Sequence, residues 1–284
     1  MTIKQYRDHF IQELTPIHGA DEAESFFYLI LEEKNKLRRI DLALHLDLSF
    51  TPIEIEYYND LLQQLKLEIP VQYLLGNAHF YGMEFNVNEN VLIPRSETEE
   101  LVDWIVSDCK NGQATKPLKI LDIGTGSGCI AIALAKNISN VEVFAIDVSK
   151  QALATAKKNA EKNGVNVTFI LADILNTEKL QQEFDIIVSN PPYIRNLEKV
   201  EIKKNVLEYE PHLALFVADD NALIFYRKIA ALAQQHLVNG GYLYYEINQY
   251  LGKETISLLE EFAFKNIALQ KDIYGNDRMT KSQK

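Results

Sequence analysis

An asparagine, two prolines and a tyrosine, Asn190 to Tyr193, directly follow an apolar run that predicts a buried strand ending at Ser189. Consecutive prolines remove two backbone donors and cannot continue a helix, and the residue before a proline is held extended. The segment is therefore expected to be a stiff loop with one amide side chain, bare carbonyl groups and one aromatic ring. Such a loop can simply turn a corner, or it can hold a ligand.

The residue types in this loop suit a planar –NH2 group. The Asn190 side-chain oxygen and the Pro191 carbonyl can accept its two hydrogens, while Tyr193 can pack on its flat face. Acceptors placed in this way also favour positive charge that grows on the nitrogen during a displacement reaction. Asn190, Pro191 and Tyr193 are therefore the candidate catalytic residues. Pro192 is expected to line the substrate site with them.

A second signal is the glycine-rich stretch "LDIGTGSGCIAIALA" at residues 121–135. Glycines at a strand-to-helix turn permit tight geometry and let a ligand approach the backbone closely. The spacing is G-x-G-x-G, and Cys129 stands where the nicotinamide fingerprint has its last glycine. Together with Asp122, the loop resembles the S-adenosylmethionine loop of class I methyltransferases; a glycine-rich turn without a ligand is the alternative. The candidate cofactor-binding residues of this loop are Gly124, Thr125, Gly126, Ser127 and Gly128.

Two acids follow the next two predicted strands. Asp147 lies about 20 residues beyond the glycine loop, where an acid commonly binds ribose hydroxyls in this kind of fold. Its alternative role is that of a helix N-cap before "VSKQALATA". Asp173 ends the third strand, near the expected position of an adenine, and an acid with a purely local role in the loop is an equal alternative.

The elements that must position these residues change character along the chain. Residues 1–75 carry apolar residues at helical spacing and predict a small helical bundle, in which Thr51, Pro52 and Glu54 form a typical helix start. Residues 76–95 alternate and predict a β-hairpin linker. In residues 96–284, short apolar strands alternate with helices, which is the rhythm of a parallel, doubly wound α/β sheet.

Composition excludes several classes of protein. The 284-residue chain has a formal net charge of −11, which disfavours stable nucleic-acid binding. No apolar run approaches the roughly 20 residues that span a bilayer, so no membrane association is expected. The two cysteines, Cys109 and Cys129, are far apart and lack metal-ligand spacing. We expect no metal, no disulfide framework and a cytoplasmic location.

An extended set of segments resembles the release-factor glutamine methyltransferases, the HemK/PrmC family, over essentially the full length. The segments are "VQYLLGNAHFYGMEFNVNENVLIPRSETEELVDW", "DIGTGSGCIAIALA", "FDIIVSNPPYI", "YEPHLALFVADD", "GGYLYYEI" and "DIYGNDRM". The resemblance implies a Rossmann-like, seven-stranded class I methyltransferase domain preceded by a helical domain that recognises the partner. It also implies methyl transfer from S-adenosylmethionine, leaving S-adenosylhomocysteine, to the glutamine amide in the Gly-Gly-Gln loop of peptide-chain release factors. We expect a monomer.

The resemblance also implies roles for individual residues. Residues 124–128, Asp147 and Asn190 would contact the cofactor, with Asp173 and Ile174 beside the adenine. Residues 190–193 would hold the glutamine, and residues 210–211 would shape the loop that covers the site.

Two further residues, Arg95 and Glu97, would line the site near the methionine moiety or the substrate loop. A helix-capping cluster is the alternative for them, because Ser96 and Glu99 have capping-box spacing.

The sequence departs from the family pattern at a few positions. Ser96 stands where the family usually has proline, residues 217–218 replace a common glycine pair, and "INQYLG" lacks the usual glutamine placement. None of these positions belongs to the Asn-Pro-Pro-Tyr segment.

Three other functions compete with this interpretation. The main alternative is a nucleic-acid methyltransferase that acts on the exocyclic amines of adenine or guanine. Such an enzyme would need a basic groove or a target-recognition domain, and it would flip out or capture an unpaired base. A binding protein without turnover would not need both the glycine loop and Asn190. A nicotinamide-dependent oxidoreductase disagrees with the loop spacing.

Overall fold

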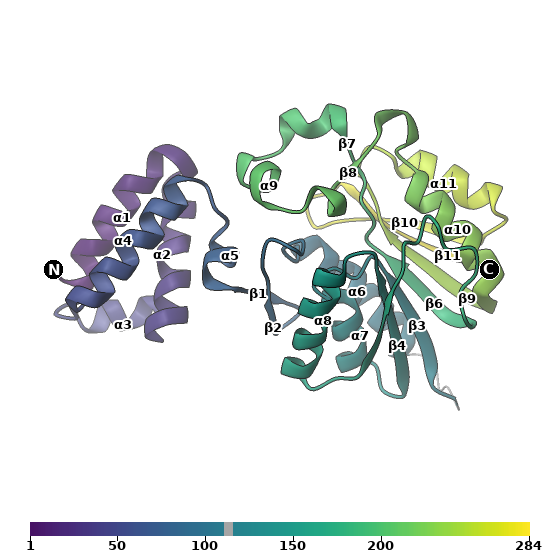
Figure 1. Cartoon of the computed structure of the whole chain (residues 1–284), viewed down its shortest axis with the longest axis horizontal. Helices are drawn as coiled ribbons and strands as arrows, with labels where there is room; N and C mark the ends of the chain where they lie inside the picture. The colour runs from purple at the N-terminus through teal and green to yellow at the C-terminus, as the bar shows by residue number, and fades with distance from the viewer. Residues whose placement is uncertain (111–115) are drawn as a thin grey trace. The chain divides into compact units, whose positions relative to one another are not determined.

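The computed structural model describes residues 1–110 and 116–284. The chain forms two compact units, whose elements are labelled in Figure 1. The first unit comprises Met1–Gly76 and Lys203–Tyr209, and the second comprises Asn77–Ile202 and Glu210–Lys284. No sequence pattern indicated that residues 203–209 group with the first unit. Within the described residues, no helix is both long and apolar enough to cross a membrane.

The first unit is a helical bundle. Its helices are α1 (Ile3–His18), α2 (Ala20–Asn35), α3 (Arg39–Leu44), α4 (Pro52–Lys66), α5 (Val71–Leu75) and α9 (Lys204–Tyr209). Apolar residues at helical spacing meet in one buried cluster that includes Phe10, Phe27 and Tyr58. The predicted start of α4 is confirmed: the Thr51 hydroxyl accepts a hydrogen bond from Glu54 N, and the Glu54 carboxylate accepts one from Thr51 N.

The second unit begins with the predicted β-hairpin, whose strands are β1 (Asn77–Phe80) and β2 (Met83–Asn86). Tyr81 and Gly82 form the turn with positive φ angles of 49° and 71°, as a tight two-residue hairpin requires. Phe80 and Phe85 are buried in the core of this unit. The Asn159 side chain of α8 (Lys150–Asn163) accepts from Asn86 N and donates to Asn86 O, which fixes the hairpin to that helix.

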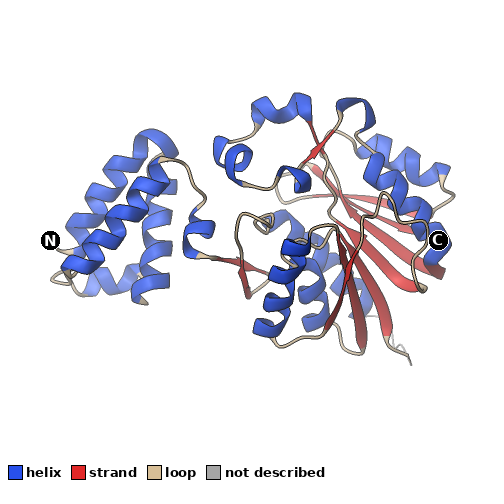
Figure 2. Ribbon diagram, viewed as in Figure 1, coloured by secondary structure: helices blue, strands red, loops and turns tan. Residues whose placement is uncertain are grey.

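A seven-stranded sheet with the order β10-β11-β9-β6-β3-β4-β5 forms the centre of this unit (Figure 2). Its strands are β3 (Leu118–Ile123), β4 (Val141–Asp147), β5 (Val167–Leu171), β6 (Phe184–Ser189), β9 (Leu237–Glu246), β10 (Lys265–Lys271) and β11 (Asp277–Gln283). The first five are parallel, and β10 and β11 pair antiparallel at one edge. Because β4 and β6 flank β3 on opposite sides, the strand order reverses there, and open α/β sheets bind ligands at such a point.

Helices cover both faces of the sheet, as buried parallel strands require. In β6, Ile186 and Val188 pack with α6 (Ser96–Lys110), α7 (Cys129–Asn137) and α8, while Phe184 and Ile187 pack with α10 (Ile224–His236) and α11 (Gly252–Glu261). Two short strands, β7 (Ile194–Arg195) and β8 (Phe216–Val217), pair beside the sheet, and 3-10 turns occupy 196–201, 212–214 and 219–221. The predicted Rossmann-like architecture is confirmed.

Gly128 is the position where the turn before α7 most needs a glycine. Its φ is 83°, and an added Cβ would lie 2.9 Å from Ile132 Cδ1 and 3.1 Å from Ala156 Cβ. Gly164, the C-cap of α8, has a φ of 65° but would place a Cβ in open space. Substitution of either glycine therefore strains the backbone, but only at Gly128 would the added Cβ also clash with neighbouring side chains.

We expect Gly128→Ala to lower the free energy of unfolding more than Gly164→Ala, by about 1–3 kcal/mol, because overpacking adds to the cost of a positive φ. Urea denaturation followed by circular dichroism measures both variants against the wild type. Equal losses in the two variants would contradict the close approach of α7 and α8 at Gly128.

Candidate active site

The glycine loop and the Asn-Pro-Pro-Tyr loop start from paired residues at the carboxyl edge of the sheet. Ile123 at the end of β3 is in register with Ser189 at the end of β6, and the Ser189 hydroxyl donates to the Ile123 carbonyl at 2.6 Å. Gly124 and Asn190 therefore leave the sheet side by side. Together with the ends of β4 and β5, the two loops border a cavity of about 320 Å³.

Most of the predicted site residues line this cavity. They are Gly124, Gly126, Asp147, Asp173, Ile174, Asn190, Pro191 and Pro192. Sequence reasoning missed the segment after the hairpin, Glu89 to Leu92, and the apolar residues Leu213, Phe225 and Ile229, which also line it. Pro211 lines the cavity too, as expected for the covering loop. Six predicted residues do not: Arg95, Glu97, Thr125, Ser127, Gly128 and Tyr193.

Only part of the glycine loop faces the cavity, because other residues of the loop are buried in the protein. Gly124, Gly126 and Gly128 all have positive φ angles. Thr125 is 4% exposed, and its hydroxyl donates to Asp122 Oδ2 at 2.6 Å. Ser127 is 2% exposed. Thr125 and Ser127 therefore face the protein interior, whereas the backbone of Gly124 and Gly126 faces the cavity.

Asp147 contacts the same loop directly. Its Oδ2 atom accepts from Gly126 N at 2.8 Å, and its Oδ1 atom accepts from Ser149 N at 2.8 Å. Burial raises the pKa of Asp147, and hydrogen bonds from Ser149 and Gly126 oppose that shift. The alternative role of Asp147 as a helix N-cap is wrong, because Ser149 caps α8 by accepting from Ala152 N. Each carboxylate oxygen keeps a lone pair for a hydroxyl in the cavity.

Asp173 has the local role in the loop, and its place beside an adenine stays a prediction. Its Oδ1 atom accepts from Leu175 N at 2.9 Å, and its Oδ2 atom accepts from Asn176 Nδ2 at 2.6 Å, so the side chain shapes the turn after β5. Asp173 and Ile174 both line the cavity.

The Asn-Pro-Pro-Tyr loop is tied to the protein at three atoms. The Asn190 Nδ2 group donates to Thr98 Oγ1 at 3.3 Å. The Tyr193 hydroxyl donates to Glu246 Oε1 at 3.1 Å, and the Tyr193 carbonyl accepts from Asn248 Nδ2 at 3.0 Å. The Tyr193 ring packs against the buried core on the α10 side of the sheet. These contacts leave Asn190 and Pro191 at the cavity wall and hold Tyr193 behind it.

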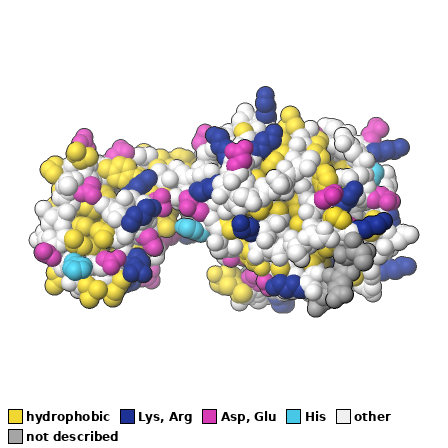
Figure 3. Space-filling view, turned by 90° about the horizontal axis from the view of Figure 1, so that it is seen from below, with side chains coloured by type: hydrophobic (Ala, Val, Ile, Leu, Met, Phe, Trp, Pro, Cys, Tyr) yellow, Lys and Arg dark blue, Asp and Glu magenta, His cyan; other side chains and the backbone are white. Residues whose placement is uncertain are grey.

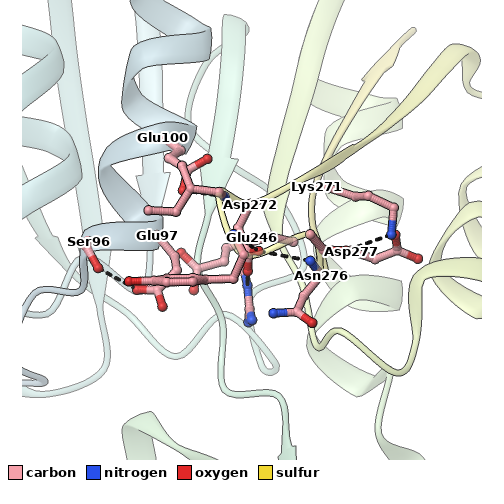
Figure 4. Close-up of polar contacts among 12 residues, drawn as sticks. Ser96, Glu97, Glu100, Glu246, Lys271, Asp272, Asn276 and Asp277 are labelled. Atoms are coloured by element: carbon pink, nitrogen blue, oxygen red, sulfur yellow. Dashed lines mark hydrogen bonds and ion pairs between the residues drawn. The ribbon is translucent and has the colours of Figure 1, made fainter.

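Glu246 is a functional candidate that sequence reasoning missed. It is 1% exposed, it ends β9, and it lies next to the loop because β9 pairs in parallel with β6. Burial raises the pKa of Glu246, while Thr98, Arg278 and Tyr193 lower it again. Figure 4 shows Glu246 among polar residues from α6 and from the turn between β10 and β11. The sequence signal that could have identified Glu246 is its position at the end of a parallel strand, because the same rule identified Asp147.

Arg95 and Glu97 lie outside the cavity and have different partners. Arg95 Nη2 donates to Glu210 Oε1 at 2.6 Å, and Glu210 Oε2 accepts from Ile93 N at 3.2 Å. Glu97 accepts from the Ser96 hydroxyl at 3.0 Å (Figure 4). The predicted capping box is wrong, since Glu99 accepts instead from Tyr81 N at the hairpin turn. Through its contact with Glu210, Arg95 thus fixes the segment that covers the site.

Asp122, beneath the glycine loop, is the most deeply buried acid of this region. It is 0% exposed, and its Oδ1 atom has no hydrogen-bond partner within the described residues. Burial raises the pKa of Asp122 to about 7, although the hydrogen bond from Thr125 opposes the shift. The folded protein therefore binds this proton more tightly than the unfolded chain does, so acidification from pH 7 toward pH 4 stabilises the fold through this group.

We expect the wild type to gain about 2–3 kcal/mol of unfolding free energy over Asp122→Asn when the pH falls from 8 to 5. The reason is that the amide has the same shape as the carboxyl group but cannot ionise, so this side chain no longer makes the free energy of unfolding depend on pH. Urea denaturation at each pH measures the difference, with the exposed Asp220→Asn as the matched control. A difference that does not change with pH would show that Asp122 is not buried as described.

Comparison with known proteins agrees with this geometry. Residues 5–76 match the PrmC N-terminal domain model, and residues 114–276 match the Methyltransferase domain model. Two solved structures share the fold: the T. thermophilus 16S rRNA N2 G1207 methyltransferase RsmC (TM-score 0.52, 19% identity, 73% of this chain and 49% of that chain) and the hMettl16 catalytic domain (TM-score 0.53, 17% identity, 72% and 75%).

Sequence relatives agree over nearly the whole length. A release factor glutamine methyltransferase of Flavobacterium psychrophilum is 62% identical over 281 residues, which cover 99% of each chain. One of Bacteroides thetaiotaomicron is 41% identical over 269 residues, 94% of this chain and 95% of the relative. The chain belongs to the release factor glutamine methyltransferase family.

Proposed function

We propose that this protein transfers a methyl group from S-adenosylmethionine to the side-chain amide nitrogen of the glutamine in the Gly-Gly-Gln loop of peptide-chain release factors. The observation that carries the proposal is the position of Asn190 and Pro191 on the wall of the same cavity as the glycine loop. An acceptor pair for an –NH2 group thus lies beside a loop suited to a nucleoside cofactor. Relatives up to 62% identical that are named for this activity support the proposal.

The cavity residues fit S-adenosylmethionine. A Cβ added at Gly124 or Gly126 would meet nothing within 4 Å, so the backbone there is open to a ligand. Asp147 offers carboxylate oxygens for ribose hydroxyls, and Ile174 offers an apolar side chain beside Asp173 for an adenine. A mainly apolar cavity with a few polar groups is typical of cofactor sites. When bound there, S-adenosylmethionine supplies an electrophilic methyl group.

The contribution of the chain to the reaction is mainly positioning. A carboxamide nitrogen is a poor nucleophile because its lone pair is delocalised, so its orientation must supply much of the rate enhancement. Asn190 Oδ1 and the Pro191 carbonyl accept the two N–H groups, and they stabilise the positive charge that develops on nitrogen. No strong base is required, because an N-methylated amide cation loses its proton to water. The Tyr193 ring, fixed through its hydroxyl, supports the loop from behind the cavity wall.

The helical unit is proposed as the element that recognises the release factor, by its match to the PrmC N-terminal domain. Nucleic acid is disfavoured as the substrate by the net charge of −11. On the face drawn in Figure 3, lysine and arginine side chains are interspersed with acidic ones rather than gathered in one basic groove. The monomeric state and the cytoplasmic location stay predictions.

We expect labelled S-adenosylmethionine to label a release factor but neither its Gln→Ala variant in the Gly-Gly-Gln loop nor RNA, because only the glutamine carries the matching carboxamide. Scintillation counting after separation measures the incorporation. Label on RNA, with none on the release factor, would overturn the assignment in favour of the nucleic-acid methyltransferase.

Replacing Asn190 tests the acceptor. We expect Asn190→Ala to lower kcat at least about 100-fold, as loss of an oriented transition-state partner does, while the Kd for S-adenosylmethionine changes less than about tenfold. Calorimetry gives the Kd, and single-turnover labelling gives the rate. Asn137→Ala, an exposed asparagine in α7, is the control. Loss of cofactor binding by several orders of magnitude would show that Asn190 serves the cofactor rather than the substrate.

A further inference from the structure

Thr98 of α6 connects the Asn-Pro-Pro-Tyr loop to a buried carboxylate. Its hydroxyl donates to Glu246 Oε2 at 2.6 Å and accepts from Asn190 Nδ2 at 3.3 Å. Thr98 is 2% exposed and Glu246 is 1% exposed, so water cannot readily replace either contact. Neither residue lines the cavity. Both therefore act on the site through Asn190 rather than by touching a ligand.

The direction of each hydrogen bond follows from the chemistry of the groups. A carboxylate accepts only, and a threonine hydroxyl has a single proton to donate. Because Thr98 gives that proton to Glu246, its oxygen can only accept from Asn190. Asn190 must then turn its NH2 group toward Thr98, which leaves Oδ1 for the cavity that Asn190 lines.

We propose that Glu246 and Thr98 are positioning residues that set the amide orientation of Asn190, so that its oxygen rather than its NH2 group meets the –NH2 group of the substrate. The proposal rests on the proposed function and deepens it. The two orientations of a carboxamide have nearly the same shape, so steric fit does not choose between them. In the wrong orientation, two donors would face each other at the reacting nitrogen.

Two hydrogen bonds favour the acceptor form of Glu246, while burial raises its pKa. The Tyr193 hydroxyl donates to Oε1, so both carboxylate oxygens receive a hydroxyl proton. The Arg278 side chain of β11, whose Nε donates to Asp272 Oδ2 at 3.1 Å, is a nearby positive charge that lowers the pKa of Glu246. The negative charge of Glu97 in α6 raises that pKa. Figure 4 shows Glu97, Asp272 and Glu246 in this group.

Removing the Thr98 hydroxyl tests the orientation. We expect Thr98→Val, which keeps the shape, to lower kcat for release-factor methylation about 10- to 100-fold, with the Kd for S-adenosylmethionine unchanged within about twofold. Thr98→Ser should restore most of the rate, because it keeps the hydroxyl. Thr255→Val is the matched control: Thr255 of α11 is 0% exposed, and its hydroxyl donates to the carbonyl of Leu251, the residue before that helix, away from the cavity. An unchanged kcat in Thr98→Val would overturn the proposal.

Changing the carboxylate tests the same relay from its other end. Glu246→Gln has one acceptor and one donor group, so it cannot accept from Thr98 and Tyr193 together. We expect kcat to fall about tenfold or more. Wild-type kcat should also fall on acidification, because Glu246 gains a proton and becomes a donor. This acid-side fall in kcat should be missing from the pH profile of Glu246→Gln. The same acid limb in both proteins would contradict the role of Glu246.

A measurement without substrate separates this proposal from the proposed function. In ¹⁵N-labelled protein, the Asn190 NH2 signals, identified by their loss in Asn190→Ala, should show nuclear Overhauser effects to the Thr98 side chain. These effects should disappear in Asn190→Asp, which has no NH2 group. Their presence in a protein that does not methylate release factor would overturn the function alone. Their absence in the wild type would overturn the relay, whatever the substrate.

Discussion

The pairing of β3 with β6 is the constraint on which the site depends. Ile123 and Ser189 are in register, and each is followed at once by a loop of the cavity. Side chains alternate between the faces of a sheet, so a slip of one residue would turn every side chain of β6 to the opposite face. The two apolar clusters on the two faces therefore fix the distance between the glycine loop and Asn190.

Each of the two loops is also tied by a hydroxyl to a buried acid. Thr125 joins the glycine loop to Asp122 at 2.6 Å, and Thr98 joins Asn190 to Glu246 at 2.6 Å. Burying a carboxylate is unfavourable unless hydrogen bonds compensate, and burial raises the pKa of both acids. An apolar contact would hold a loop at lower cost, but it has no donor or acceptor direction. The acids thus contribute orientation in addition to cohesion.

Local patterns predict the fold and the edge of the sheet at which the site lies. Apolar runs, glycines and prolines locate the strands and loops, and the rule for carboxyl ends of parallel strands brings Gly124, Asp147 and Asn190 together. Local patterns do not name the partner of a polar side chain that lies far along the chain. Thr98 and Glu246 are 148 residues apart, and Arg95 and Glu210 are 115 apart. Capping-box spacing at Ser96 was misleading for the same reason, since Glu99 bonds to the hairpin.

Packing can select the size and shape of a side chain, but a carboxamide keeps both when it rotates by half a turn. Only a neighbour with a fixed hydrogen-bond direction distinguishes the oxygen from the NH2 group. A lone hydroxyl lacks such a direction, because its proton rotates freely between partners. An acceptor-only group behind the hydroxyl removes that freedom. The buried Glu246 satisfies this requirement in a way that neutral polar side chains, which both donate and accept, do not.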